Sequence, residues 1–261
     1  MLSLRTLVSK AAVAKPLFAN AQIAKVAACI GVHYSKELRP VPDDYRIPKY
    51  MEDIYTWCYV KPVNVKKLDC QLVVQTILFG YFQPLANMVC SEIKPGESIL
   101  QTGSTYGKLI ETVCKKLGPD GTYNICDIMP IQLLLLIKMV LLIILKKMVL
   151  MIMHPIYIYA LSFLLLHEVP DETKTAVINR IMKSVKVGGK AIFIEYHKAK
   201  WYSPWRYMMP VVYWLLEPLA FPVWNKQITE LGDPELVKNF KWRKQTRFMG
   251  LYQKLVGIRM V

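Results

Sequence analysis

The sequence predicts an α/β fold built on a doubly wound, largely parallel sheet. Helices precede the sheet, and an apolar aromatic insertion precedes its last strands. Short apolar segments alternate with amphipathic segments between residues 97 and 197, and strands that alternate with helices form parallel sheets. The 261 residues allow one large domain with appendages. We therefore expect a single α/β domain over residues 51–261.

The elements follow in a regular order. Residues 68–96 have apolar residues at helical spacing, interrupted near Gly80 and Pro84, which predicts one or two helices. The alternating elements come next: strands at 97–102, 121–128, 158–166 and 190–197, helices at 106–118 and 171–189, and two final strands within 240–260. Asp171 is the expected N-cap of the second helix, and Gly188 follows its end.

Residues 133–153 (LLLLIKMVLLIILKKMVLMIM) must supply a crossover helix and a further strand in this scheme. A crossover helix should have a polar face, and almost none is present here. Lys146 and Lys147 keep the apolar run shorter than the roughly 20 residues that span a bilayer. Three interpretations stay open: a buried or membrane-facing helix and strand, a true membrane segment, or a segment whose sequence has drifted.

The N-terminus has the composition of a targeting segment. Residues 1–36 contain no acidic residue, while basic residues are spread among alanine, valine, leucine and serine. This pattern is typical of a mitochondrial presequence, although a plain amphipathic surface helix would also fit. The proline-rich residues 37–50 read as a linker. We expect a protein of the mitochondrion or a related organelle, associated with the inner membrane.

The net charge and the composition restrict the classes of binding partner. The net charge is +15 and 54% of the residues are hydrophobic, which favours an anionic membrane surface. We do not expect a nucleic-acid partner, because base-reading motifs are absent and the basic residues are scattered. No C-x-x-C pair supports a zinc site.

A turn and an acidic residue together predict a cofactor site. Gly103 in "ILQTGSTYG" lets the backbone approach a ligand closely, and the N–H groups of residues 104–107 can bind a carboxylate. Asp127, followed by Ile128, ends the next strand, where a carboxylate accepts both hydroxyls of a ribose. S-adenosylmethionine fits better than a dinucleotide, because the glycine triplet for a pyrophosphate is missing. An ordinary turn without ligand is the alternative. The predicted cofactor-binding residues are Gln101, Gly103, Ser104, Thr105, Tyr106, Gly107, Asp127 and Ile128.

Two further strand ends carry candidate catalytic residues. His167 and Glu168 follow one strand, and Tyr196 and His197 end the next. Both ends should face the same cleft. A histidine with a carboxylate suits proton transfer or a divalent cation, so we expect His167 and His197 as metal ligands or acid–base groups. Polar loops that pack on helix ends are the alternative.

Residues 201–225 contain four tryptophans, three tyrosines and four prolines. Tryptophan and tyrosine favour the membrane interface, and Lys200 and Arg206 can face lipid phosphates. We expect a lid that dips into the interface and admits a lipid-tailed molecule. An apolar cap on the core is the alternative.

Segments spread along residues 50–258 resemble the rhodoquinone biosynthesis methyltransferase-like family. "CSEIKPGESILQTGSTYG", "TYNICDIMPIQL", "LSFLLLHEVPDETK" and "VKVGGKAIFIEYHK" occur in the family's order. The resemblance implies a class I methyltransferase-like fold and conversion of ubiquinone to rhodoquinone. In that reaction an amino group replaces a ring methoxy group. S-adenosylmethionine would be the amino donor, assisted by a divalent metal such as Mn²⁺.

The sequence departs from ordinary methyltransferases at two places. Gln101 stands where they carry an acid near the cofactor's positive end, and "MVLMIMHP" lacks the acid that ends their third strand. The first difference agrees with amination. The second, with the apolar residues 133–153, favours an alternative function, a catalytically silent membrane scaffold. An ordinary quinone methyltransferase is a further alternative, against which Gln101 and the single-glycine turn argue.

Overall fold

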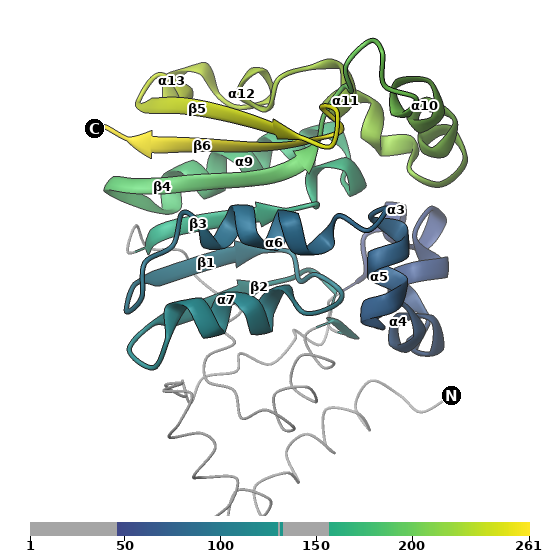
Figure 1. Ribbon diagram of the computed structural model, residues 1–261, viewed down its shortest axis with the longest axis horizontal. Coiled ribbons are helices and arrows are strands. Elements are labelled where there is room, and N and C mark those ends of the chain that lie inside the picture. The colour runs from purple at the N-terminus through teal and green to yellow at the C-terminus, as the bar shows by residue number, and fades with distance from the viewer. Residues whose placement is uncertain (1–45, 130, 133–156) are drawn as a thin grey trace, which may run out of the picture.

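The computed structural model describes residues 46–129, 131–132 and 157–261. Its centre is a six-stranded sheet in the order β2-β1-β3-β4-β6-β5, as Figure 1 shows. The strands β1 to β4 pair in parallel, and β6 runs antiparallel to both β4 and β5. The strands are β1 (Ser98–Thr102), β2 (Thr122–Cys126), β3 (Tyr157–Phe163), β4 (Val185–Tyr196), β5 (Phe240–Arg247) and β6 (Tyr252–Arg259). The predicted α/β class with a largely parallel sheet is confirmed.

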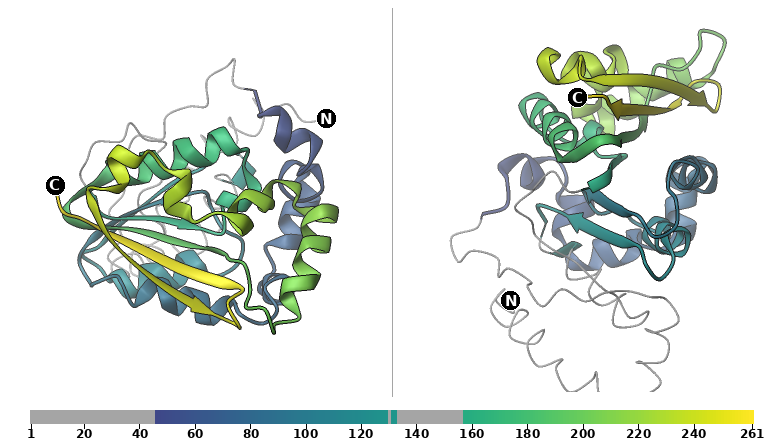
Figure 2. Two further views of the ribbon diagram at one scale, coloured as in Figure 1. Left: turned by 90° about the horizontal axis from the view of Figure 1, so that it is seen from above. Right: turned by 90° about the vertical axis from the view of Figure 1, so that its left-hand side faces the viewer.

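Alternation along the strands divides the core into two parts. In β4, Ile192 and Ile194 belong to one buried cluster, whereas Ala191 and Phe193 belong to the other. Successive side chains of a strand point to opposite faces, so each face needs its own helical cover. The first face is covered by α6 (Phe82–Cys90) and α7 (Leu109–Leu117), and the second by α9 (Asp171–Ser184), as the two views of Figure 2 show.

Short helices lie at one end of the sheet. They are α3 (Lys49–Asp53), the π-helical turn η2 (Thr56–Val60), α4 (Pro62–Leu68) and α5 (Gln71–Ile77). The predicted break near Gly80 is present, since Gly80 lies between α5 and α6 with a φ of +78°. Pro84 falls in the first turn of α6, where its missing N–H costs no helical hydrogen bond. Lys49 and Tyr50, placed in the linker, already belong to α3.

The predicted cap of α9 is wrong. Pro170 occupies the N-cap position, and Asp171 is the first helical residue, where its carboxylate accepts a hydrogen bond from Lys174 at 2.9 Å. The helix ends at Ser184, sooner than expected. Gly188 and Gly189 lie inside β4, beside an irregularity in its pairing with β3. The two glycines therefore belong to β4 and do not terminate α9.

The insertion before the last strands folds into α10 (Trp205–Leu216), the 3₁₀ turn η4 (Pro218–Ala220) and α11 (Phe221–Asn225). Short helices α12 (Ile228–Leu231) and α13 (Pro234–Val237) follow. Tyr213 and Trp224 from the insertion are buried in the core. The apolar cap expected as an alternative is thus present on the inner side of the insertion.

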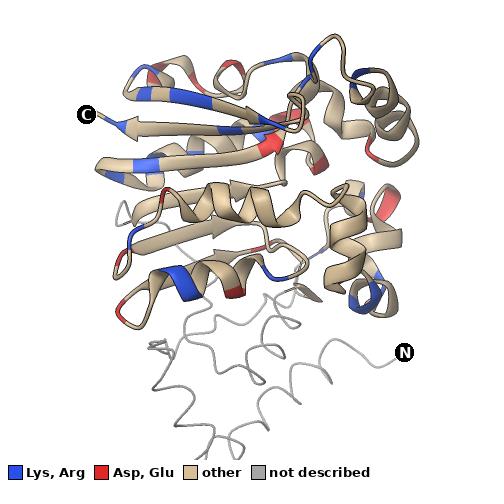
Figure 3. Ribbon diagram, in the orientation of Figure 1, with Lys and Arg blue, Asp and Glu red and all other residues tan. Residues whose placement is uncertain are grey.

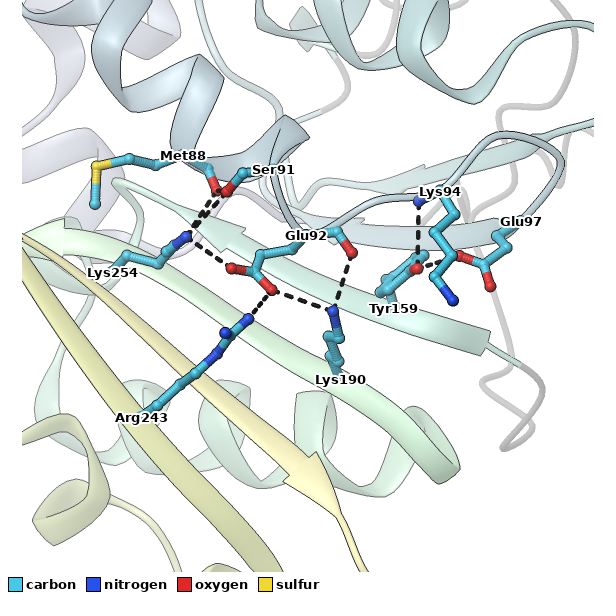
Figure 4. Close-up of polar contacts among 9 residues, drawn as sticks. All are labelled: Met88, Ser91, Glu92, Lys94, Glu97, Tyr159, Lys190, Arg243 and Lys254. Atoms are coloured by element: carbon cyan, nitrogen blue, oxygen red, sulfur yellow. Dashed lines mark hydrogen bonds and ion pairs between the residues drawn. The ribbon is translucent and has the colours of Figure 1, made fainter.

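Glu92, just after α6, joins this helix to the last strands (Figure 4). Its side chain is 4% exposed and accepts hydrogen bonds from Lys254 at 2.7 Å, from Lys190 at 3.2 Å and from Arg243. Three cations compensate the desolvation of one buried carboxylate. The contact links α6 to β4, β5 and β6.

Within the described residues, no single helix is long and apolar enough to cross a bilayer. The helices α5 and α6 are long and apolar enough only when they are taken together, and the two helices are bent by 95° relative to each other. The candidate membrane segment 133–153, the targeting segment 1–36 and most of the linker lie outside the described residues.

Candidate functional site

Two adjoining cavities lie at the carboxyl ends of the parallel strands. The larger has a volume of about 690 Å³ and is lined by the turn after β1, by Asp127 after β2 and by part of α9. The smaller, of about 120 Å³, is lined by aromatic residues of η2 and the turn, and by His167 and Glu217. We call them the cofactor cavity and the ring cavity. Glu168 and Tyr59 line both, so the two cavities share a wall.

The turn after β1 depends on Gly103. Its φ is +75°, a conformation that residues with a side chain rarely adopt. A Cβ atom there would lie 2.9 Å from Leu165 Cδ1. The glycine therefore lets the turn lie close to Leu165 in the loop after β3, and the predicted close approach to a ligand stays a prediction.

Asp127 is tied to the same turn. Its Oδ2 accepts hydrogen bonds from Ser104 N at 2.6 Å and Ser104 Oγ at 2.7 Å, and its Oδ1 accepts one from Met129 N at 2.7 Å. Burial raises the pKa of Asp127, while the Ser104 donors oppose the shift. Oδ2 thus has both of its acceptor sites occupied, whereas Oδ1 keeps capacity for one further hydrogen bond. Ile128, the next residue, also lines the cavity and is 45% exposed.

Gln101 lies beneath the turn and lines neither cavity. Its Nε2 donates to Gly103 O at 2.7 Å and to Thr105 Oγ1 at 2.9 Å, and Tyr123 donates its hydroxyl to Gln101 Oε1. The side chain is fully buried. The structure therefore assigns Gln101 to holding the shape of the turn, and a direct contact with a cofactor stays a prediction.

Two backbone N–H groups near the N-terminus of α7 already donate hydrogen bonds to side chains of the protein itself. Gly107 N donates to Asp69 Oδ1 at 3.0 Å, and Lys108 N donates to Gln71 Oε1 at 2.9 Å. Since Ser104 N is bonded to Asp127, two of the N–H groups expected to bind a carboxylate have partners. Thr105 and Tyr106 line the ring cavity instead, where Tyr106 stacks on Tyr59 with ring centroids 5.4 Å apart. Gly107 itself lines neither cavity.

His167 is fixed by a carboxylate of the neighbouring strand. Its Nδ1 lies 2.8 Å from Glu195 Oε1, and both side chains are buried. Burial alone would lower the pKa of His167, but the carboxylates of Glu195, Glu168 and Glu217, with Glu195 the largest contributor, together raise it to about 9. Within the part of the chain that the structure describes, Nε2 makes no hydrogen bond, and Glu168 Oε1 lies 3.8 Å from it.

Two glutamates with raised pKa values face this imidazole. Burial and the Glu217 charge raise the pKa of Glu168 to about 8, and burial also raises that of Glu217. Tyr59 donates to Glu168 Oε1 at 2.5 Å, and Tyr55 donates to Glu217 Oε2 at 2.8 Å. Glu168 thus exchanges protons near neutral pH, as acid–base groups do.

His167, Glu168 and Glu217 each offer one ligand atom within 4.8 Å of the others. Glu217 was missed by the sequence analysis, because it ends α10 in a segment interpreted only as a lid. Nothing near it in the sequence marks it, apart from its being the only acidic residue of residues 201–225.

The structure does not bring His197 into this group. Its Nδ1 lies 2.9 Å from Gly250 O, and the ring lines neither cavity. Tyr196 does line the ring cavity, and its ring meets His167 edge-on, with the ring centroids 4.8 Å apart. The expected pairing of His167 with His197 is therefore replaced by His167 with Glu168 and Glu217.

Solved structures share this fold. Phosphoethanolamine N-methyltransferase 2 of Haemonchus contortus, in complex with S-adenosyl-L-methionine, matches with a TM-score of 0.56 and 11% identity, over 85% of this chain and 62% of that one. The CurJ carbon methyltransferase matches with a TM-score of 0.54 and 13% identity, over 77% and 61%. Mitomycin 7-O-methyltransferase MmcR matches with a TM-score of 0.52 and 12% identity, over 76% and 58%.

The fold is the class I methyltransferase fold. The chain spans less than two thirds of each of these three neighbours. No protein-family model matches the sequence, and no curated protein matches it significantly. The neighbours therefore establish the architecture, and the chemistry has to be argued from the cavities.

Proposed function

We propose that this protein is an S-adenosylmethionine-dependent transferase that acts on a quinone ring and converts ubiquinone to rhodoquinone. The observation that carries the proposal is Glu168, which lines both cavities and joins a cofactor-sized cavity to an aromatic-walled one. The larger volume is within the usual range for ligand pockets. Tyr59 and Tyr106, which stack on each other at 11°, both line the smaller cavity and offer aromatic surface against which a planar ring can pack.

In the cofactor cavity, Oδ1 of Asp127 would accept a hydrogen bond from a ribose hydroxyl, and Gly103 would lie under the ligand. The acceptors Asp69 and Gln71 at the N-terminus of α7 support an unusual position for the amino-acid part of S-adenosylmethionine. At a helix N-terminus a ligand carboxylate normally binds free N–H groups, but at α7 it would face the Asp69 carboxylate instead. Such a position agrees with a reaction at the amino group of the cofactor and not at its methyl group.

The residues of the ring cavity fit a divalent cation. Nε2 of His167 has no hydrogen bond among the described residues, and Glu168 and Glu217 supply carboxylate oxygens beside it. One imidazole with two carboxylates suits a hard or borderline cation such as Mn²⁺. Glu195 would orient the imidazole from behind, as carboxylates commonly do for metal-bound histidines. A bound cation would polarise a quinone carbonyl.

The experiment is a product assay with the full chain in detergent. The protein is incubated with S-adenosylmethionine, Mn²⁺ and ubiquinone, and the quinone is analysed by mass spectrometry. We expect a product lighter by the difference between a methoxy and an amino group. Asp127→Asn should weaken S-adenosylmethionine binding in calorimetry, and Glu217→Gln should weaken Mn²⁺ binding in electron paramagnetic resonance.

His197→Gln is the matched control, because His197 lines neither cavity and should leave both binding steps unchanged. A methylated quinone would instead show an ordinary quinone methyltransferase. No product from a folded protein that binds S-adenosylmethionine would favour the catalytically silent scaffold. Mn²⁺ binding that survives Glu217→Gln but not His197→Gln would overturn the ligand set.

We also propose that the protein works at the mitochondrial inner membrane. The acid-free composition of residues 1–36 supports this location. Import of a fusion of residues 1–36 to a fluorescent protein tests it, and a fusion that stays outside the organelle would contradict it.

A further inference from the structure

The helix α10 presents an apolar face to solvent. Met209 and Tyr213 on its inner side are 1% and 0% exposed, whereas Tyr207, Val211 and Trp214 on its outer side are 70%, 56% and 73% exposed. The spacing of these three residues places them along one stripe of the helix. A surface helix of a water-soluble protein normally carries polar residues on that side. An exposed apolar stripe of this kind marks an interaction surface.

The apolar surface continues on both sides of α10. Trp201 in the turn before α10 is 75% exposed, Leu72 of α5 is 74% exposed, and Leu215 within α10 itself adds a side chain that is 62% exposed. The helices α10 and α5 lie at the same end of the molecule in Figure 1 and in the left view of Figure 2. We name this surface the apolar rim, and its members are Trp201, Tyr207, Val211, Trp214, Leu215 and Leu72.

Basic residues flank the apolar rim. Residues 198–216 contain Lys198, Lys200 and Arg206 and no acidic residue. On the other side, α4 carries the exposed Lys66 and Lys67. Figure 3 shows both groups at this end of the molecule, in the turn before α10 and on α4. Positive charge beside exposed tryptophan and tyrosine matches the composition of surfaces that bind anionic lipid.

We propose that the apolar rim docks on an anionic lipid bilayer. Its aromatic side chains would lie at the level of the headgroups, and the flanking lysines would face lipid phosphates. A second copy of the chain is a poorer occupant, because a symmetric pair would bring the basic residues of both copies together.

The rim also borders the ring cavity. Trp57 and Ile77 line that cavity while being 43% and 48% exposed, and Glu217 at the end of α10 lines it from the other side. A lipid-tailed quinone can therefore pass from the bilayer into the cavity between α5 and α10. This entry route rests on the proposed function, whereas the docking does not.

Vesicle flotation of the full chain tests the docking without any enzymatic readout. The vesicles are phosphatidylcholine alone, or phosphatidylcholine mixed with phosphatidylglycerol. The double variant Trp214→Ser/Leu215→Ser removes two exposed side chains of the rim. The matched control is Val187→Ser/Met260→Ser, which removes two apolar side chains that are 66% and 57% exposed near the opposite end of β4.

We expect the wild-type chain and the control to float with the mixed vesicles, and the rim variant to lose about tenfold or more in binding. Binding should also fall in phosphatidylcholine alone and at high salt. Equal flotation of the rim variant and the control would overturn the proposal. A wild-type chain that does not bind vesicles would also overturn it, if light scattering shows that this chain forms a dimer and that the rim variant does not. If the chain binds vesicles but forms no product in the quinone assay, the docking proposal stands and the proposed enzymatic function is contradicted.

Discussion

The Nδ1 atom of His167 lies 2.8 Å from Oε1 of Glu195, and this pair joins the ends of two neighbouring parallel strands. The second oxygen of Glu195 accepts a hydrogen bond from Leu166 N at 2.8 Å, so the carboxylate is anchored on the loop that carries His167. The imidazole is thereby oriented with Nε2 toward Glu168. Orientation of a histidine by a buried carboxylate is common at catalytic and metal sites.

Glu195→Gln should lower the pKa of His167. Burial lowers this pKa, and the Glu195 carboxylate is the main group that raises it to about 9. Without that charge we expect a value below 9, measured from the imidazole C2–H signal by NMR. His197→Gln serves as the control and should leave the His167 titration unchanged. An unaltered titration in Glu195→Gln would refute the pairing.

The stability of the protein should decline as the pH rises above about 5. The pKa of Glu168 is raised by burial from 4.5 to about 8, and that of His167 is raised from 6.5 to about 9. The folded state therefore binds more protons than the unfolded state. The contribution of Glu168 to the free energy of unfolding is fully present below pH 4.5 and is lost as the pH rises through 8.

Urea unfolding at a series of pH values measures this slope, and Glu168→Gln should flatten it between pH 4.5 and 8. Added Mn²⁺ should stabilise the chain most at the upper end of this range, because cation binding needs Glu168 ionised and His167 unprotonated. A slope that Glu168→Gln leaves unchanged would contradict the assignment.

Gly103→Ala should weaken binding of S-adenosylmethionine at least tenfold. The new Cβ would meet Leu165 at 2.9 Å on the floor of the cofactor cavity. Gly118→Ala is a matched control, since its φ of +70° brings similar strain with no atom within 4 Å of the new Cβ. Both variants should lose about 1–2 kcal/mol of unfolding free energy. Calorimetric titration that shows equal affinity for the two variants would disprove the role of Gly103.

Gln101→Asp should disturb the turn after β1. An aspartate cannot donate to Gly103 O and Thr105 Oγ1, as the Gln101 amide does. A buried acceptor that loses its donor costs about 1–3 kcal/mol. We expect a lower midpoint of urea unfolding and weaker amination. Gln101→Glu, with the same length but no donor, should behave alike. Unchanged turnover in Gln101→Asp would reject any link between Gln101 and the reaction.

Glu92→Gln should destabilise the chain by about 2–3 kcal/mol near neutral pH, because Lys254 stays buried without its carboxylate. Burial opposes ionisation of Glu92, but Lys254 and Lys190 outweigh it and hold the pKa below its ordinary 4.5. The stabilisation is present above pH 4.5 and is lost as the pH falls below it. The wild-type chain and Glu92→Gln should therefore converge in acid, and a constant difference would argue against the ion cluster.

Local pattern was enough to predict much of the fold. The alternation of apolar strands with amphipathic helices predicted β1, α7, β2, β3 and α9, because each has a periodicity that one sequence window contains. The turn at Gly103 and the acid at Asp127 were predictable for the same reason, since a positive φ and a strand end are local features. Both residues line the larger cavity, whereas the inward direction of the Gln101 side chain was not visible in the sequence.

Only the tertiary structure decided the second half of the site. Glu217 reaches Glu168 and His167 because the segment after β4 folds back over the strand ends, and no local window records that contact. His197 is turned to Gly250 by the pairing of β4 with β6. Asp69 occupies the N-terminus of α7 because α4 and α5 pack beside it. The sequence by itself determined the sheet and the turn at Gly103 after β1. Packing between distant segments determined which carboxylates meet the histidine, because burial and charge act between neighbours in space.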